Sequence, residues 1–164
     1  MQVNISFFLD EHGWSSCRIS SGKQSYEFSI THAFPEGPIK ACIDSLISIM
    51  QGEKECRFNW YSEPGGDQVL IQEIPTEKHK VFFRVFSFHE DYGEKINNQE
   101  LFGKEADLEF EIKKIQLIRM FYFGFKKIYE LLKDRQFASN REYCFPDKIF
   151  LEFEMVAKEY IQLK

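Results

Sequence analysis

Residues 56–74 read CRFNWYSEPGGDQVLIQEI, two strand-like runs separated by a turn-forming segment. In the first run Cys56, Phe58 and Trp60 alternate with more polar residues, as in a strand with one buried face. The segment Glu63–Asp67 contains a proline followed by two glycines, a composition typical of tight turns. The second run follows this turn directly. We therefore predict a β-hairpin here, and with it an antiparallel sheet.

Four further strands are predicted around this hairpin. Alternating apolar and polar residues predict strands at 3–9 and 14–20, joined by a turn at Gly13, and a third strand at 26–30. These three strands are expected to form a meander. After the hairpin, residues 81–88 are apolar on both faces, which indicates a central strand.

Three helices are predicted from apolar residues spaced three and four positions apart. The first begins at Pro38, whose missing N–H is harmless there, and ends before Gly52. The second spans residues 108–135, and the third begins after Pro146. The polar segment 89–105 lacks periodicity and is predicted to be a long connection.

The predicted fold class is α+β, in a single domain covering residues 1–164. We expect an antiparallel sheet of about six strands, with one helix inserted between two three-strand meanders and two C-terminal helices packed on the sheet. A chain of 164 residues is long enough for one well-buried core. The hydrophobic fraction of 43% and the aromatic fraction of 16% supply the apolar surface that such a core needs.

Composition also limits the possible partners and compartment. The net charge of -5 repels phosphate backbones, so we expect no nucleic-acid partner. No run approaches the roughly 20 apolar residues that a membrane span requires, and the first ten residues lack the pattern of a signal peptide. We expect a cytoplasmic protein with no membrane partner. Four cysteines without paired spacing are expected to be reduced and buried: Cys17, Cys42, Cys56 and Cys144.

No residue pattern predicts a catalytic, metal-binding or cofactor-binding constellation. The four histidines lack zinc-site spacing, and motifs that activate a serine or cysteine nucleophile are missing from the sequence. His89, Glu90 and Asp91 are the densest group of potential ligands, but neighbouring strand residues point to opposite sides. Cys144 precedes a helix start and is interpreted as a packing residue. We therefore predict no catalytic residue, no metal and no cofactor.

The candidate binding residues are Trp60, Tyr61, Glu63 and Asp67, which lie in or beside the hairpin turn. Aromatic neighbours can raise the pKa of a carboxyl group by removing water from it. One hypothesis is therefore a small hydrolase or ligand-binding enzyme centred on Glu63. The alternative interpretation is that Glu63 is only the first residue of a proline–glycine turn.

The run Phe121–Tyr122–Phe123 suggests a different kind of function. Three consecutive rings on a helix cannot all face one core. Either the helix is covered on two sides, or one ring marks a contact with a partner or with a second copy of the chain. A structural or oligomerisation module that forms a homodimer is thus a further hypothesis.

The segment FNWYSEPGG at residues 58–66 resembles a group of small bacterial α+β proteins with a W-x-x-E-P-G hairpin. In these proteins a helix precedes the hairpin and further helices follow it. Several such families resemble immunity proteins of polymorphic toxin systems, which protect the producing cell by binding a toxin. The resemblance extends from Tyr26 onward and implies a non-catalytic binding protein. Trp60, Glu63 and the turn are the matching positions, and a basic toxin domain would suit the acidic surface.

Overall fold

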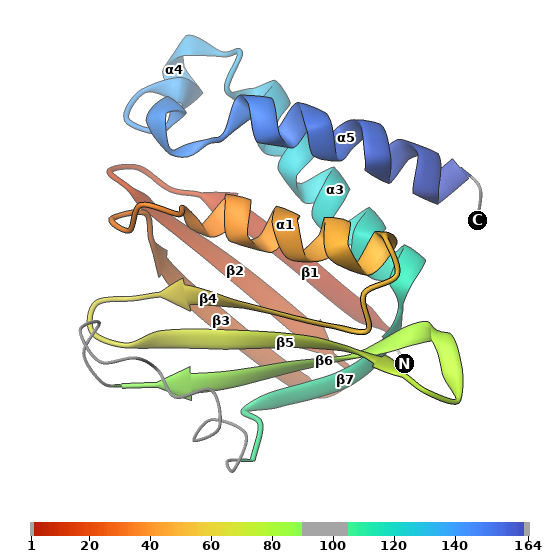
Figure 1. Cartoon of the computed structure of the whole chain (residues 1–164). Coiled ribbons are helices and arrows are strands. Elements are labelled where there is room, and N and C mark those ends of the chain that lie inside the picture. Colours follow the sequence, from red (N-terminus) through yellow and green to blue (C-terminus); the bar gives the residue numbers. More distant parts are fainter. Residues whose placement is uncertain (1, 90–104, 163–164) are drawn as a thin grey trace.

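The computed structural model describes residues 2–89 and 105–162, which form seven strands and several helices (Figure 1). In chain order the elements are β1 (Val3–Leu9), β2 (Trp14–Ser21), β3 (Gln24–Thr31), α1 (Pro38–Met50), β4 (Glu55–Tyr61), β5 (Gly66–Ile74), β6 (Glu77–Phe88), β7 (Leu108–Lys113), α3 (Lys114–Leu131), α4 (Arg135–Ala138), the short 3-10 helix η1 (Glu142–Cys144) and α5 (Asp147–Gln162).

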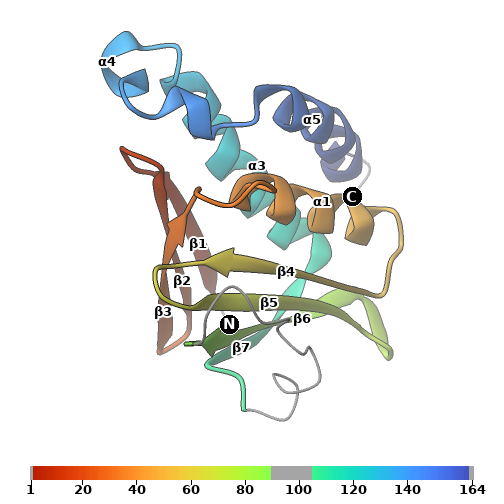
Figure 2. The same ribbon diagram turned by 60° about the vertical axis from the view of Figure 1, so that its left-hand side comes forward.

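The strands belong to two antiparallel sheets. One sheet has the order β1-β2-β3 and the other β4-β5-β6-β7. The two sheets meet at a steep angle, with β3 beside β4 (Figure 2). Helix α1 lies along β4, α3 packs on β1, and α5 covers α1 and α3 from outside (Figure 1). The main core fills the space that the two sheets, α1 and α3 enclose.

This arrangement confirms the α+β class and corrects its details. The expected single sheet of about six strands is wrong, because the strands divide into sheets of three and four. The alternating patterns predict each strand but carry no information on whether β3 and β4 share hydrogen bonds. Trp60 of β4 packs between the two sheets, against Phe7 of β1 and Phe28 of β3.

The seventh strand, β7, occupies the expected start of the long helix. Leu108, Phe110 and Ile112 are buried and alternate with exposed residues, and β7 pairs with β6. Leu108 and Ile112 are four positions apart, a spacing that suits both a helix and a strand. The helical assignment of 108–113 is therefore wrong, and α3 begins at Lys114 and ends at Leu131.

Other expectations for the helices and strands are confirmed. Helix α1 begins at Pro38, and Gly52 follows its end with a φ of 100°. Strand β6 is central, between β5 and β7. The C-terminal helix starts after Pro146. Most of the predicted connection at 89–105 lies outside the described residues.

Two apolar clusters form on opposite faces of the four-stranded sheet. The main core takes residues from both sheets and from α1, α3 and α5. A smaller cluster on the other face contains Leu70, Phe86 and Phe88. Cys17 and Cys42 are fully buried, whereas Cys56 and Cys144 are only half-buried. None of the described helices has the length and apolar character needed to cross a membrane.

Candidate functional site

The β4–β5 hairpin directs the four candidate residues to different environments. Trp60 and Asp67 lie opposite each other in the strand register and are both buried. Tyr61, the next residue along β4, belongs to the opposite face of the sheet. Glu63 is exposed in the turn that joins the two strands. The structure therefore does not bring the four residues together into one site.

Trp60 lies at the centre of the core and has no exposed surface. Its ring contacts four phenylalanines, and its Nε1–H donates a hydrogen bond to the carbonyl oxygen of Pro38 at 3.0 Å. This bond ties β4 to the first turn of α1. The indole is therefore placed to hold the hairpin and the helix together rather than to touch a docked molecule.

The local structure also explains why the W-x-x-E-P-G pattern has a glycine at position 65. Gly65 has a φ of +78°, and a Cβ added there would lie 2.2 Å from the carbonyl oxygen of Phe88. The Ser62 N–H donates to the Gly65 carbonyl at 2.9 Å and closes the turn. Glycine is required here because only it adopts this conformation without strain and leaves room for β6.

Asp67 connects the two sheets from inside the molecule. Tyr26 of β3 donates its hydroxyl to Asp67 Oδ1 at 2.5 Å. Burial raises the pKa of the Asp67 carboxyl to about 6, and the Asp107 carboxylate also raises it. Burial and the bond to Asp67 also raise the pKa of Tyr26. With only 7% of its surface exposed, Asp67 is not available to a large partner.

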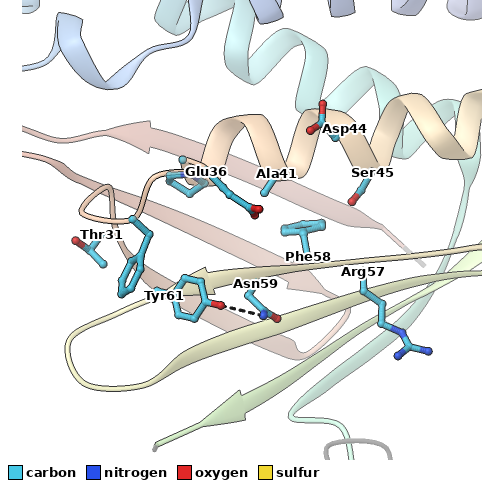
Figure 3. A pocket seen from close by; sticks show the side chains of 12 residues that line it. Thr31, Glu36, Ala41, Asp44, Ser45, Arg57, Phe58, Asn59 and Tyr61 are labelled. Carbon is cyan, nitrogen blue, oxygen red and sulfur yellow. Dashed lines mark hydrogen bonds between the residues drawn. The ribbon is translucent and has the colours of Figure 1, made fainter. Parts of the chain in front are cut away.

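Tyr61 lines a depression of about 320 Å³ between α1 and β4. Figure 3 shows Phe58, Asn59 and Tyr61 on the β4 side and Ala41 and Ser45 on the α1 side.

Glu36 precedes α1, and its carboxylate points toward the space between these two rows of side chains (Figure 3). Phe34, from the same loop, also lines the depression, with its ring centroid 4.5 Å from that of Tyr61. An aromatic pair and a carboxylate therefore face the same space.

A chain of hydrogen bonds orients the polar end of Tyr61. Gln68 Nε2 donates to Asn59 Oδ1 at 3.3 Å. Asn59 Nδ2 in turn donates to the Tyr61 hydroxyl at 3.3 Å, the bond drawn in Figure 3. Gln68 itself is buried, so this series of hydrogen bonds runs from the interior to the depression. These bonds fix the position of the ring before anything binds to it.

Glu63 lines a second depression of about 480 Å³, which also contains His12, His32, Tyr143 and Cys144. Thr31 donates its hydroxyl to Glu63 at 3.5 Å, the limit of a hydrogen bond. Thr31, Phe34 and Gly37 line both depressions. We call the combined concave region the Phe34 surface.

His32, which lines the second depression, contacts the buried Ser15 behind it, but this burial does not suit nucleophilic catalysis. Ser15 Oγ lies 2.6 Å from His32 Nε2, and Ser15 is 1% exposed. Burial lowers the pKa of His32 to about 4, which keeps the imidazole neutral and makes it a weak base at pH 7. Burial also raises the pKa of the Cys144 thiol, which disfavours the reactive thiolate.

Within residues 2–89 and 105–162, no group of three histidine, cysteine or acidic side chains is placed to hold a metal ion. Of the sequence His89–Glu90–Asp91, only His89 belongs to the described residues.

Sequence reasoning missed Phe34, Glu36 and Asn59, which line the Phe34 surface together with Tyr61. The signal that was available is the pair Phe34–Pro35, an aromatic residue in a short loop just before a helix. Loop aromatics of this kind often contribute to binding surfaces.

The chain matches no protein-family model, no curated protein and no solved structure. Inferences about its function therefore rest on its own residues and geometry.

Proposed function

We propose that this chain is a non-catalytic binding protein that holds a basic segment of another protein on the Phe34 surface. A cytoplasmic immunity protein that neutralises a bacterial toxin is the specific form that we favour. The proposal rests mainly on one observation: the Phe34 surface is concave, aromatic and acidic. Burial lowers the pKa of His32 and raises the pKa of the Cys144 thiol, and both shifts disfavour catalysis.

The charges of the Phe34 surface support a basic partner. Three carboxylates line it, those of Glu36, Asp44 and Glu63, against one guanidinium, that of Arg57. Asp44 already forms an ion pair with Lys40, so Glu36 and Glu63 are the carboxylates left for a partner. Arg57 forms an ion pair with Glu55, and its side chain points away from the depression in Figure 3. Lysine or arginine side chains of a partner could bind these carboxylates and pack on the rings of Phe34 and Tyr61.

A charge-reversal experiment tests this proposal. The chain is coexpressed with the product of the neighbouring gene, and complex formation is measured by copurification and calorimetry. The variant Glu36→Lys/Glu63→Lys should weaken the complex by about 100-fold or more, because two attractive contacts become repulsive. A control, Glu152→Lys/Glu159→Lys on α5, changes the net charge equally and should retain the affinity. The proposal fails if the neighbouring product does not bind or if both variants bind equally well.

Protection of cells tests the immunity function separately. Cells that produce the neighbouring protein should survive when they also carry the wild-type chain and should die when they carry the Glu36→Lys/Glu63→Lys variant. Survival that is independent of this chain would contradict the immunity function even if a complex forms.

The alternative function, a small hydrolase centred on Glu63, draws support from the second depression, where two histidines and Tyr143 accompany this carboxylate. A panel of ester and phosphoester substrates tests it. Turnover that disappears in Glu63→Gln but persists in Glu152→Gln would favour the enzyme. Absence of turnover for the wild-type chain across the panel would favour the binding protein.

A further inference from the structure

A separate cavity of about 420 Å³ lies at the other end of α1. The end of α1, the start of β6, the β7–α3 junction and α5 all contribute residues to it, and these segments meet at the right-hand side of Figure 1. Met50, Ile115 and Tyr160 form its apolar part, whereas Lys78, His79 and Lys113 contribute the basic groups. It shares no lining residue with the Phe34 surface.

The basic groups of this cavity are available to a ligand. Lys78, His79 and Lys113 are exposed, and within the described part of the chain none of them forms an ion pair. A further lysine, Lys114, is buried at the cavity and is neutralised by Glu73, with the Nζ and Oε2 atoms 2.5 Å apart. A local positive charge thus remains on a molecule whose net charge is -5.

The combination of size, apolar lining and charge defines a ligand class. Small-molecule cavities typically measure about 300–1,000 Å³ and combine apolar walls with a few polar groups. A neutral apolar molecule would not use the lysines, and a bare phosphate would leave the apolar side chains in water. A polyanion such as nucleic acid would be repelled by the net charge of -5 on the whole molecule.

We propose that this cavity binds an amphiphilic anion, a carboxylate that carries an apolar chain. The carboxylate lies at Lys78 and Lys113, and the chain packs on Met50, Ile115 and Tyr160. The two parts of the ligand match the two parts of the cavity, since the lysines provide charge-assisted hydrogen bonds and the apolar side chains exclude water. This site is independent of the function proposed for the Phe34 surface.

Three probes with the same chain and different head groups test the site on the full-length protein. Octanoate, 1-octanol and octyltrimethylammonium are titrated by NMR, with the Met50 and Ile115 methyl signals as reporters. Octanoate should bind at least about tenfold more tightly than either of the others, and its affinity should fall as salt is added. Equal binding of the three probes, or shifts confined to residues of the Phe34 surface, would overturn the proposal.

Paired variants separate the role of charge from a general effect on the protein. Lys78→Glu/Lys113→Glu should lower octanoate affinity about tenfold or more, whereas Lys127→Glu/Lys148→Glu, with the same net charge, should bind like the wild type. Met50→Gln should weaken octanoate binding while leaving its salt dependence unchanged. Thermal unfolding confirms that each variant is folded. Equal losses in the two lysine pairs would overturn the proposal.

Discussion

The two faces of the β4–β5 hairpin are made by alternate residues of the same strands, yet they serve different purposes. On the inner face Trp60 and Asp67 are buried and bind α1 and β3. On the outer face Asn59 and Tyr61 are only partly buried, and they line a depression. The inner residues should therefore control stability, and the outer ones should control binding.

Truncation of the central ring should have the largest effect on stability. Trp60→Ala removes a fully buried side chain and should lower the free energy of unfolding by about 3–5 kcal/mol, because the cavity that remains cannot collapse completely. Denaturant unfolding monitored by circular dichroism measures this loss in the free energy of unfolding. The control Trp60→Phe keeps a ring but loses the bond to Pro38, and it should cost less. A loss below about 1 kcal/mol in Trp60→Ala would show that Trp60 is not a core residue.

The second largest effect should be a pH dependence due to Asp67. Its pKa is raised from 3.8 to about 6 on folding, so the folded state binds this proton more tightly than the unfolded state. The resulting stabilisation is complete below pH 3.8 and is lost as the pH rises through about 6. We expect a change on the order of 2 kcal/mol across this window. In Asp67→Asn this contribution should disappear.

Unfolding curves at several pH values test the prediction for Asp67. Tyr26, Asp107 and His89 are the other titratable groups that act on this carboxyl, so their effects must be separated from its own. Glu152→Gln, an exposed acidic residue on α5, provides the control. If Asp67→Asn and the wild type lose stability equally between pH 4 and 6, Asp67 is not the group responsible.

A smaller effect on stability is expected on the outer face. Phe34→Ala removes a half-buried ring that contacts Tyr61, and it should cost about 1 kcal/mol. The same variant should lose far more affinity for a bound partner, because aromatic side chains dominate binding energy at such surfaces. Denaturant unfolding measures the effect on stability, and calorimetry on the same preparation measures the effect on binding. If Phe34→Ala lowered the free energy of unfolding more than the free energy of binding, the outer face would control stability rather than binding.

The smallest effect should come from Phe123 on α3. Phe121 is buried against the sheets and Tyr122 against α5, whereas Phe123 is 60% exposed. Phe123→Ser should therefore change stability by no more than about 0.5 kcal/mol. Sedimentation at several concentrations tests the homodimer hypothesis with the same variant. A wild-type dimer that Phe123→Ser dissociates would support this hypothesis, and a monomeric wild type would contradict it.

Much of the secondary structure follows from the sequence because its signals are local. Alternation identified β1 to β4, the turn after β4 identified β5, and a run that is apolar on both faces identified β6. Pro38 and Pro146 marked helix starts, and Gly52 marked a helix end. The error at β7 arose because the four-residue spacing of Leu108 and Ile112 fits the period of a helix and that of a strand equally well. For the rings at 121–123 the sequence left two alternatives, a helix covered on two sides or a ring that marks a partner contact. The structure shows α3 covered by the sheets and by α5, whereas the partner contact at the exposed Phe123 stays a prediction.

The candidate site was predictable only in part. Tyr61 and Glu63 do line depressions, but Trp60 and Asp67 are buried. Glu36 and Phe34 were missed because they lie more than twenty positions from Tyr61 and meet it only through the packing of α1 on β4. The amphiphile cavity likewise joins residues as distant as Met50 and Tyr160.

The sequence alone determined the α+β class, most helix and strand positions, and the position of the β4–β5 turn. These features depend on backbone preferences and on periodic burial, which neighbouring residues specify. Only the tertiary structure decided the division into two sheets, the seventh strand and the composition of both concave sites. Those features depend on contacts between distant segments, which become favourable only when the whole core excludes water.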